Sequence, residues 1–512
     1  MKNTMTPWSC GVLLIIVTGF WITASAQQSC ESLKSLELPN VTITSASAIT
    51  PPWKVPAQTG FLSTAEDLSV AVPFCRIEGF SAPTSDSHIG FEVWLPDPAN
   101  WNGRFLAAGN PGFIGSIARG ALAGIVQRGY VTASTDTGHV DEGFEWAIGH
   151  PEKWADWGHR AVHETAVVTK AFAQRYYGKA VQYSYWNSCH NGGNQGLNEA
   201  QRYPEDFDGI VAGDPAFHIS HLQSGSLYIS WVALKDGVGA PGYIPPEKYP
   251  IVHGAVLDSC DAIDGLVDGI LEDPRQCHFD PTSIRCHGPD GQACLTAPQV
   301  ETAKKIYAGA RFADGTQIYS GMERGSELGW SLLTKGPDPF WVNVAYFKGM
   351  VFEDPNWDFR TFDVDRDTRL AEAKTGAAVD SLNPNLQPFK DSGGKLILYQ
   401  SWNEPGLPPR TLIEYYTSVE KALGGPAQTR DFTRLFIVPA SAGCPGFRNA
   451  EDFATLSAVQ KWVEEGVAPD RIIYSHRHEN QVYRSRPVCP YPEVSHYQGN
   501  GNPDDAGSFI CK

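Results

Sequence analysis

The sequence predicts an α/β fold built on a mainly parallel β-sheet, and three observations support that prediction. Segments of strand length, rich in apolar, β-branched or aromatic residues, recur at 104–109, 130–134, 182–187 and 208–212. Their interiors are apolar, as in parallel strands that helices cover on both faces. Helical patterns separate the later strands, and the strand pattern resumes after a long interruption.

The other elements follow in a regular order along the chain. Residues 91–95 alternate in the manner of a strand. A helix is expected over 159–177, because apolar residues there lie one turn apart and Gly178 suits the position that ends a helix. Another amphipathic helix follows the strand at 182–187. A third is expected over 411–423, between two further buried strands, which are 395–399 and 434–438.

The N-terminal segment, residues 1–26, has the features of a secretory signal peptide. A lysine at position 2 precedes an apolar run at 12–20 and the small residues Ala24-Ser25-Ala26, so cleavage would leave Gln27 first. The apolar run is too short for a comfortable membrane span, and no later segment qualifies. We therefore expect a protein that is secreted or held in the lumen of the secretory pathway.

The remaining chain is expected to form two parts. Residues 27–215 and 389–512 form the core that contains the sheet, and residues 216–388, rich in Pro, Gly and aromatic side chains, form an inserted lid domain.

Ten of the eleven cysteines lie outside the signal segment, which permits five disulfides in an oxidising compartment. Asn40 begins a glycosylation sequon. A formal net charge of −17 argues against nucleic acid or an anionic membrane as partner.

A sharp turn of small residues after the strand at 182–187 indicates the functional site. A strand, a tight turn and a helix in succession have the shape of a nucleophile elbow, which holds a reactive side chain at its tip. Such an elbow usually reads Gly-x-Ser-x-Gly, and here the five positions are Ser188, Cys189, His190, Asn191 and Gly192. A histidine therefore stands where a serine is expected.

Further motifs surround and follow the elbow. The run from Tyr185 to Pro215 contains Gly192-Gly193-x-Gln195-Gly196 and Gln201-Arg202-Tyr203-Pro204-Glu205-Asp206-Phe207-Asp208-Gly209-Ile210. Later motifs are Cys260-Asp261-x-x-Asp264-Gly265-x-x-Asp268-Gly269, Asp354-Pro355-Asn356-Trp357, Trp402-x-Glu404-Pro405, Arg434-Leu435-Phe436-x-Val438-Pro439 and Arg486-Pro487-x-Cys489-Pro490-Tyr491-Pro492. In this order they resemble the tannase and feruloyl esterase family, whose members are secreted serine esterases that cleave esters of phenolic acids.

The resemblance implies an α/β-hydrolase core and a lid that binds the phenolic part of the ester. It also implies a Ser-Asp-His triad, whose three positions fall on His190, Glu404 and Gly443 of this chain. The nucleophile and the base are therefore absent, and the acid is one methylene longer. The two family cysteines next to the triad remain as Cys189 and Cys444, so the resemblance implies a disulfide behind the site.

The replaced positions suggest a different kind of site. The imidazole of His190 could fill the volume that Gly443 vacates, and the longer Glu404 could reach toward it. Our hypothesis is a hydrogen-bonded dyad in which His190 is a general acid–base near neutral pH. The alternative is that neither residue has a catalytic role and the pocket is inactive. Ser188 is a further alternative as nucleophile, although a small packed residue is expected at its position.

Backbone amides near the elbow could still stabilise negative charge. The glycine-rich segment 109–115 follows an early strand, where this architecture places one oxyanion-hole amide, although a simple tight turn has the same sequence. The amide of Asn191 is the second candidate, and together they would stabilise an enolate or a phenolate as well as a tetrahedral intermediate.

Three classes of function remain open for such a site. A base and an oxyanion hole without a nucleophile favour a repurposed enzyme in secondary metabolism. Its chemistry would be proton transfer, cyclisation, aldol reaction or cycloaddition on a phenolic or polyketide-like small molecule. Residual hydrolysis of phenolic esters, by water activated through His190, is the second class. Binding of phenolic molecules without turnover is the third.

An acidic loop at 261–270 is a candidate calcium site, because carboxylates there alternate with backbone carbonyls on a glycine-rich turn. By resemblance, the ligands of a structural calcium are the side chains of Asp261, Asp264 and Asp268 and the carbonyls of Leu266 and Ile270. A solvated acidic turn is the alternative. We expect a disulfide between Cys260 and Cys277 to brace this loop. Three further pairs complete the expected set: Cys30–Cys75, Cys286–Cys294 and Cys489–Cys511.

Overall fold

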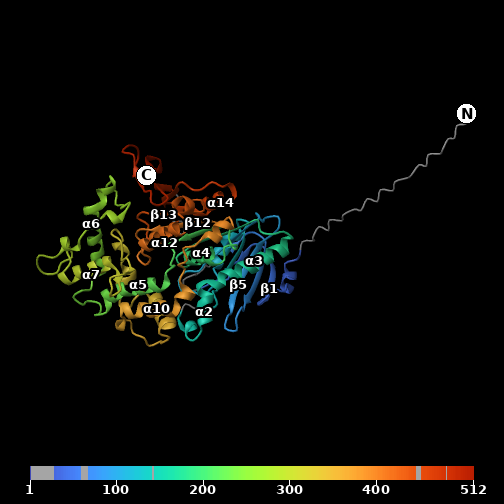
Figure 1. Ribbon diagram of the computed structural model, residues 1–512, viewed down its shortest axis with the longest axis horizontal. Coiled ribbons are helices and arrows are strands. Elements are labelled where there is room, and N and C mark those ends of the chain that lie inside the picture. Colours follow the sequence, from blue (N-terminus) through green and yellow to red (C-terminus); the bar gives the residue numbers. More distant parts are fainter. Residues whose placement is uncertain (2–27, 59–66, 141–142, 446–450, 480) are drawn as a thin grey trace.

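One large sheet runs through the core of the molecule (Figure 1). The computed structural model describes Met1 and residues 28–58, 67–140, 143–445, 451–479 and 481–512, and the predicted signal segment lies outside them. Within these residues, nine strands pair in the order β1-β4-β5-β7-β6-β8-β9-β12-β13. Their bounds are β1 Val41–Ile49, β4 Phe74–Ser81, β5 Ile89–Pro96, β6 Arg104–Ala107, β7 Val131–Thr135, β8 Tyr183–Cys189, β9 Gly209–Gly213, β12 Lys395–Ser401 and β13 Thr433–Val438.

The strands from β7 to β13 in this order run parallel to one another. At the other edge β1, β4 and β5 pair antiparallel, and β5 also pairs antiparallel with β7. The prediction of an α/β fold with a mainly parallel sheet is therefore confirmed. The residue pattern does not reveal β1 as a strand, because this edge strand consists largely of Thr, Ser and Ala and is only partly buried.

Helices cover both faces of the parallel strands, which explains their apolar interiors. On one face Leu396 and Leu398 of β12 pack in a cluster with three helices, which are α3 (Ala161–Tyr177), α4 (Asn191–Arg202) and α12 (Pro409–Ala422). On the other face Ile397 and Tyr399 pack with α14 (Thr455–Glu465). The helix predicted over 159–177 begins two residues later, as α3, because a π-helical turn at Asp156–Arg160 precedes it.

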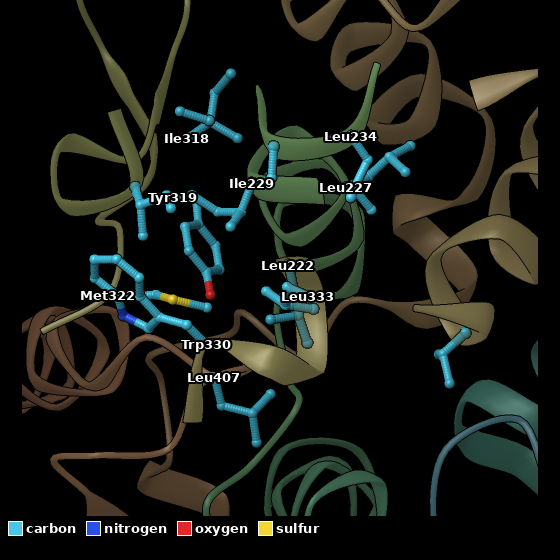
Figure 2. Close-up of a cluster of buried hydrophobic side chains, with 14 of the residues drawn as sticks. Leu222, Leu227, Ile229, Leu234, Ile318, Tyr319, Met322, Trp330, Leu333 and Leu407 are labelled. Atoms are coloured by element: carbon cyan, nitrogen blue, oxygen red, sulfur yellow. The ribbon is translucent and has the colours of Figure 1, made fainter. Parts of the chain in front are cut away.

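The chain between β9 and β12 forms a mainly helical region to one side of the sheet (Figure 1). Helix α5 (Ile219–Leu234) contributes Leu222 to an apolar cluster with Tyr319 and Trp330 (Figure 2). Phe113 and Trp157, which lie outside this region, belong to the same cluster. The region is therefore packed against the core, and its bounds as a separate lid domain at 216–388 remain a prediction.

The remaining elements are short or peripheral. The helices are α1 Arg119–Val126, α2 Pro151–Ala155, α6 Tyr249–Cys260, α7 Ala297–Ala308, α8 Ser331–Thr334, α9 Trp341–Tyr346, α10 Val364–Val379, α11 Gln387–Asp391 and α13 Pro426–Arg430. The strands are β2 Trp53–Lys54, β3 Ser69–Val70, β10 Ala310–Arg311, β11 Gln317–Tyr319, β14 Glu451–Phe453, β15 Ile472–His478, β16 Gln481–Val488, β17 Ser495–Tyr497 and β18 Phe509–Cys511.

In the described part of the chain, five disulfides join cysteines in the expected pairs, which confirms the predicted set. They are Cys30–Cys75, Cys189–Cys444, Cys260–Cys277, Cys286–Cys294 and Cys489–Cys511. None of the helices in the described part of the chain has the length and apolar character that a membrane span requires. Asn40, the predicted glycosylation site, is exposed in the turn that leads into β1.

Candidate active site

The elbow predicted from the sequence is present between β8 and α4. His190 lies at its tip and has a positive φ of 56°, with ψ −118°. The backbone on either side is tightly packed, because a Cβ atom added at Gly193 would lie 2.3 Å from the carbonyl oxygen of Gly213. Backbone strain of this kind persists only where the surrounding structure enforces it, and here it presents the side chain at position 190.

Ser188 does not serve as a substitute nucleophile in this geometry. A Cβ atom added at Gly192 would lie 2.0 Å from the Ser188 Oγ, and one added at Gly109 would lie 2.6 Å from it. The hydroxyl is therefore enclosed between these two glycines, beneath the turn. Ser188 is the small packed residue that its position suggested.

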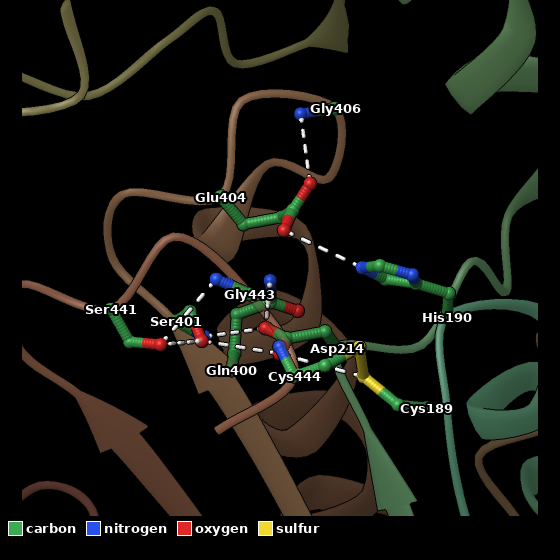
Figure 3. Close-up of a disulfide and its surroundings, with 10 residues drawn as sticks. All are labelled: Cys189, His190, Asp214, Gln400, Ser401, Glu404, Gly406, Ser441, Gly443 and Cys444. Carbon is green, nitrogen blue, oxygen red and sulfur yellow. Dashed lines mark hydrogen bonds and ion pairs between the residues drawn. A yellow bond between two sulfur atoms is a disulfide. The ribbon is translucent and has the colours of Figure 1, made fainter. Parts of the chain in front are cut away.

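His190 and Glu404 lie in contact, as the dyad hypothesis requires (Figure 3). The distance from His190 Nε2 to Glu404 Oε2 is 3.4 Å. The other carboxylate oxygen of Glu404 accepts a hydrogen bond from the Gly406 amide. The imidazole side chain is 39% exposed and the Glu404 side chain is 7% exposed. A buried carboxylate is thus in contact with the ring of a partly exposed histidine.

Glu404 rather than His190 fills most of the volume above Gly443. A Cβ atom added at Gly443 would lie 1.7 Å from Glu404 Oε2 and 3.4 Å from His190 Nε2. Gly443 also has a φ of +106°, a conformation that residues with a side chain rarely adopt. The contact between Glu404 and His190 therefore depends on the absence of a side chain at 443.

A buried carboxylate that the sequence analysis missed lies directly behind this contact. Asp214 follows β9 and accepts hydrogen bonds from the backbone amides of Ser401 and Cys444, at 2.6 and 2.7 Å. Burial and, to a smaller extent, the nearby carboxylate of Glu404 raise the pKa of Asp214 to about 6, although His190 and the two backbone amides oppose them. The available signal was an acidic residue two positions after the segment 208–212, within the run from Tyr185 to Pro215.

The glycine-rich segment lies beside the elbow, at the end of β6. The amide of Asn110 donates to Gln195 Oε1 of α4 at 3.1 Å, and the Asn110 side chain donates to the carbonyl oxygen of Thr135 at 2.8 Å. These bonds fix the turn against both the elbow helix and β7. Gly112 of this turn and Asn191 line the same cavity, so the two predicted sources of oxyanion-hole amides are brought together.

A cavity of about 440 Å³ opens over His190 and Glu404. Its walls are mainly apolar and come from both the core and the helical region, for example Phe113, Leu222 and Trp341. His190 and Glu404 are the only ionisable residues among the described residues that line it. Cavities of this size, apolar with a few polar groups, are typical of small-molecule sites.

The acidic loop at 261–270 forms a compact turn on the helical region. The Asp261 carboxylate accepts from the Gly269 amide at 3.0 Å, and Asp264 accepts from the Leu266 amide at 3.0 Å. Asp268 accepts from Arg486 at 2.6 Å. Gly265 and Gly269 have φ values of +95° and +81°. The loop thus gathers hard oxygen donors of the type that calcium prefers, with Arg486 occupying one of them.

The geometry predicts the effect of adding a methyl group at Gly443. Gly443→Ala should displace Glu404 and lower the free energy of unfolding, by roughly 1–3 kcal/mol for the backbone conformation alone. Gly466→Ala is the matched control, because Gly466 also has a positive φ, +71°, but meets nothing within 4 Å of an added Cβ. Denaturant unfolding should therefore show a larger loss for Gly443→Ala.

A double variant separates the clash from the strain. Glu404→Ala removes the carboxylate that the new methyl group would meet, so adding it should recover part of the stability lost in Gly443→Ala. No recovery, or equal losses in Gly443→Ala and Gly466→Ala, would show that Glu404 does not occupy this volume.

The comparisons with known proteins agree with this architecture. The family model described as tannase and feruloyl esterase matches residues 75–512. An uncharacterized esterase of Xanthomonas campestris pv. campestris is 36% identical over 549 residues, which cover 96% of this chain and 92% of that protein. A probable feruloyl esterase B-1 of Aspergillus flavus is 32% identical over 461 residues, which cover 86% of this chain and 87% of that protein.

Solved structures support the same assignment. An esterase from Aspergillus oryzae is 31% identical, with a TM-score of 0.86 over 94% of this chain and 99% of that chain. A tannin acyl hydrolase from Aspergillus niger, 21% identical, shares the fold with a TM-score of 0.75 over 93% of this chain and 92% of that chain. The expected α/β-hydrolase core is thereby confirmed. The chain belongs to the tannase and feruloyl esterase family.

Proposed function

We propose that this protein is an enzyme whose reaction depends on His190 as a general acid–base, without a serine nucleophile. The observation that carries the proposal is the contact between His190 and the buried Glu404, in the space above Gly443. The side chain at the elbow tip cannot form the serine acyl-enzyme of an ordinary triad, and a carboxylate orients it as the third member of a triad orients its base.

The character of the cavity supports a neutral aromatic substrate. No lysine or arginine is among the described residues that line it, and the imidazole of His190 already pairs with Glu404, so a free carboxylate would gain little in exchange for its lost hydration. Aromatic and aliphatic side chains provide most of the surface, and Gln223 and Asn343 add neutral hydrogen-bonding groups. These features suit a phenolic or polyketide-like molecule.

Proton transfer is the step that this set of groups favours. The protonated imidazole can give a proton to a substrate oxygen, or the neutral ring can remove a proton next to a carbonyl group. Amides at the start of α4 and in the glycine-rich turn would then stabilise the enolate or phenolate oxygen. Cyclisation and cycloaddition of a polyketide-like molecule begin with the same polarisation of a carbonyl group.

Two other functions remain candidates, each with a specific observation. Membership of a family with esterase relatives favours hydrolysis of a phenolic ester by water that His190 activates. A mainly apolar cavity with no serine at the elbow is equally suited to binding without turnover. The three functions differ in what they do to neutral phenolic probes: proton exchange next to the carbonyl of a ketone, hydrolysis of an ester, or binding alone.

Deuterium exchange provides the test. In D2O the protein should accelerate exchange of the protons next to the carbonyl of 4-(4-hydroxyphenyl)butan-2-one, measured by mass spectrometry. His190→Ala should lose about 100-fold or more of the acceleration, the lower range for general acid–base catalysis. His150→Ala is the matched control, because that histidine is exposed and pairs with Asp86. It should keep the full rate.

The other outcomes reject the proposal. Hydrolysis of methyl ferulate or methyl gallate without any exchange would establish the esterase function. Binding of the probe with neither exchange nor hydrolysis would establish a binding protein. Equal exchange rates in the wild-type protein and His190→Ala would remove His190 from the chemistry.

We also propose that the loop at 261–270 binds a structural calcium ion. Asp261, Asp264 and Asp268 with the carbonyls of Leu266 and Ile270 would hold it, and the donor set is entirely oxygen, which fits calcium. The bound ion would neutralise the carboxylates and fix the turn. None of the steps proposed for His190 depends on it.

Removal of metal tests this proposal. Elemental analysis of the washed, folded protein should find about one calcium per chain, and EGTA should lower the thermal midpoint because the ion binds only the folded loop. Asp264→Asn should bind less calcium and respond less to EGTA. A folded protein without calcium, or a midpoint that EGTA leaves unchanged, would contradict the proposal.

Finally, we propose that the protein is secreted after removal of residues 1–26. Five disulfides support an oxidising compartment, and the exposed Asn40 suits a glycosylated surface. Sequencing of the mature N-terminus tests the cleavage site, and retention of the apolar segment would contradict it.

A further inference from the structure

Asp214 is a buried carboxylate that bonds to the segments carrying Glu404 and Gly443. It follows β9, is 0% exposed and has a φ of 36°. Its Oδ1 accepts from the Ser401 amide at 2.6 Å and from Gln400 Nε2 at 3.0 Å. Its Oδ2 accepts from the Cys444 amide at 2.7 Å and from the Ser401 hydroxyl at 3.1 Å (Figure 3). The carboxylate therefore joins the ends of β9 and β12 to the loop after β13.

The loop that carries Asp214 also holds the elbow. The amide of His190 donates to the Gly213 carbonyl oxygen at 3.0 Å, and the His190 carbonyl oxygen accepts from the Ala216 amide at 3.1 Å. Sγ of Cys189, the residue before His190, lies 3.8 Å from Asp214 Oδ2. A single loop of four residues thus links the backbone of His190 to the carboxylate that binds the segments of Glu404 and Gly443.

Burial raises the pKa of Asp214, and its hydrogen bonds oppose that effect. Two backbone amides and two side chains donate to it, and such donors stabilise the ionised carboxylate. Glu404 and His190 are the titratable groups that act on it: the carboxylate of Glu404 repels it and the imidazole attracts it. Attraction is mutual, so an ionised Asp214 must favour the charged imidazole to the same extent.

We propose that Asp214 is a positioning residue for His190. Asp214 holds together the ends of β9 and β12 and the loop after β13, and its buried negative charge keeps the imidazole of His190 protonated over a wider range of pH. The proposal rests on the function proposed for His190. It deepens that function, because a second carboxylate behind Glu404 favours His190 as a general acid in the resting site. Asp214 itself does not reach a substrate, because it is 0% exposed and is not among the residues that line the cavity.

A purely structural role is the alternative. An asparagine at 214 would keep an oxygen acceptor for Ser401 and lose the charge, so folding and charge can be separated. Ser401→Ala is the matched control: it removes the hydroxyl that donates to the same carboxylate and leaves the charge in place.

Nuclear magnetic resonance of histidine labelled with ¹³C at Cε1 provides the test, with His190→Gln to identify the signal. In folded Asp214→Asn, the titration midpoint of His190 should move to lower pH by about half a unit or more. In Ser401→Ala it should stay at the wild-type value. An unchanged midpoint in Asp214→Asn, or an equal shift in Ser401→Ala, would overturn the proposal.

A second measurement avoids any change at 214. The carboxyl signal of Asp214 should titrate at higher pH in His190→Gln than in the wild-type protein, because an attracting charge has been removed, and an unchanged midpoint would contradict the proposal. Neither measurement uses turnover. Loss of the function proposed for His190 would appear in deuterium exchange and leave both titrations as they are.

Discussion

The carboxylate of Glu404, in contact with His190 above Gly443, is the interaction on which the site depends. Its position is possible only because residue 443 lacks a side chain, and the longer reach of Glu over Asp brings the oxygen to that space. The same carboxylate contacts the histidine at the elbow tip and orients it. The three positions 190, 404 and 443 therefore form one unit, because the glycine leaves room for the carboxylate and the carboxylate contacts the histidine.

The scaffold around this unit is rigid. The disulfide Cys189–Cys444 closes a loop of 255 residues, which is worth about 5 kcal/mol in the chain-entropy model. Asp214 adds four hydrogen bonds between the same segments. A site that must hold a histidine and a carboxylate in one orientation benefits from such a brace, because general acid–base catalysis depends on position before it depends on pKa.

Patterns that arise from local geometry could be predicted from the sequence. The parallel strands are apolar because both faces are covered, and the elbow is recognisable because only small residues fit around a left-handed tip. The cysteine pairs and the three site positions came from the resemblance to a family. Each of these predictions rests either on a geometric constraint that acts within a few residues or on the resemblance to a known family.

Features that arise only from assembly could not be predicted. Asp214 falls within the run from Tyr185 to Pro215, but its role depends on Ser401 and Cys444, which are about 190 and 230 residues away. The edge strand β1 has no strong pattern because it packs on one side only. Which aromatic residues line the cavity is likewise set by packing: Trp341 lines it, whereas Trp357 stacks on Phe347 at 5.3 Å.

Restoring the family triad is the most direct measurement of the central claim, that three linked replacements have removed serine ester hydrolysis from an otherwise intact site. A protein with His190→Ser, Glu404→Asp and Gly443→His should hydrolyse methyl ferulate about 100-fold faster than the wild-type protein or more, given what a triad contributes beyond the oxyanion hole and binding. Equal or faster hydrolysis by the wild-type protein would contradict the claim.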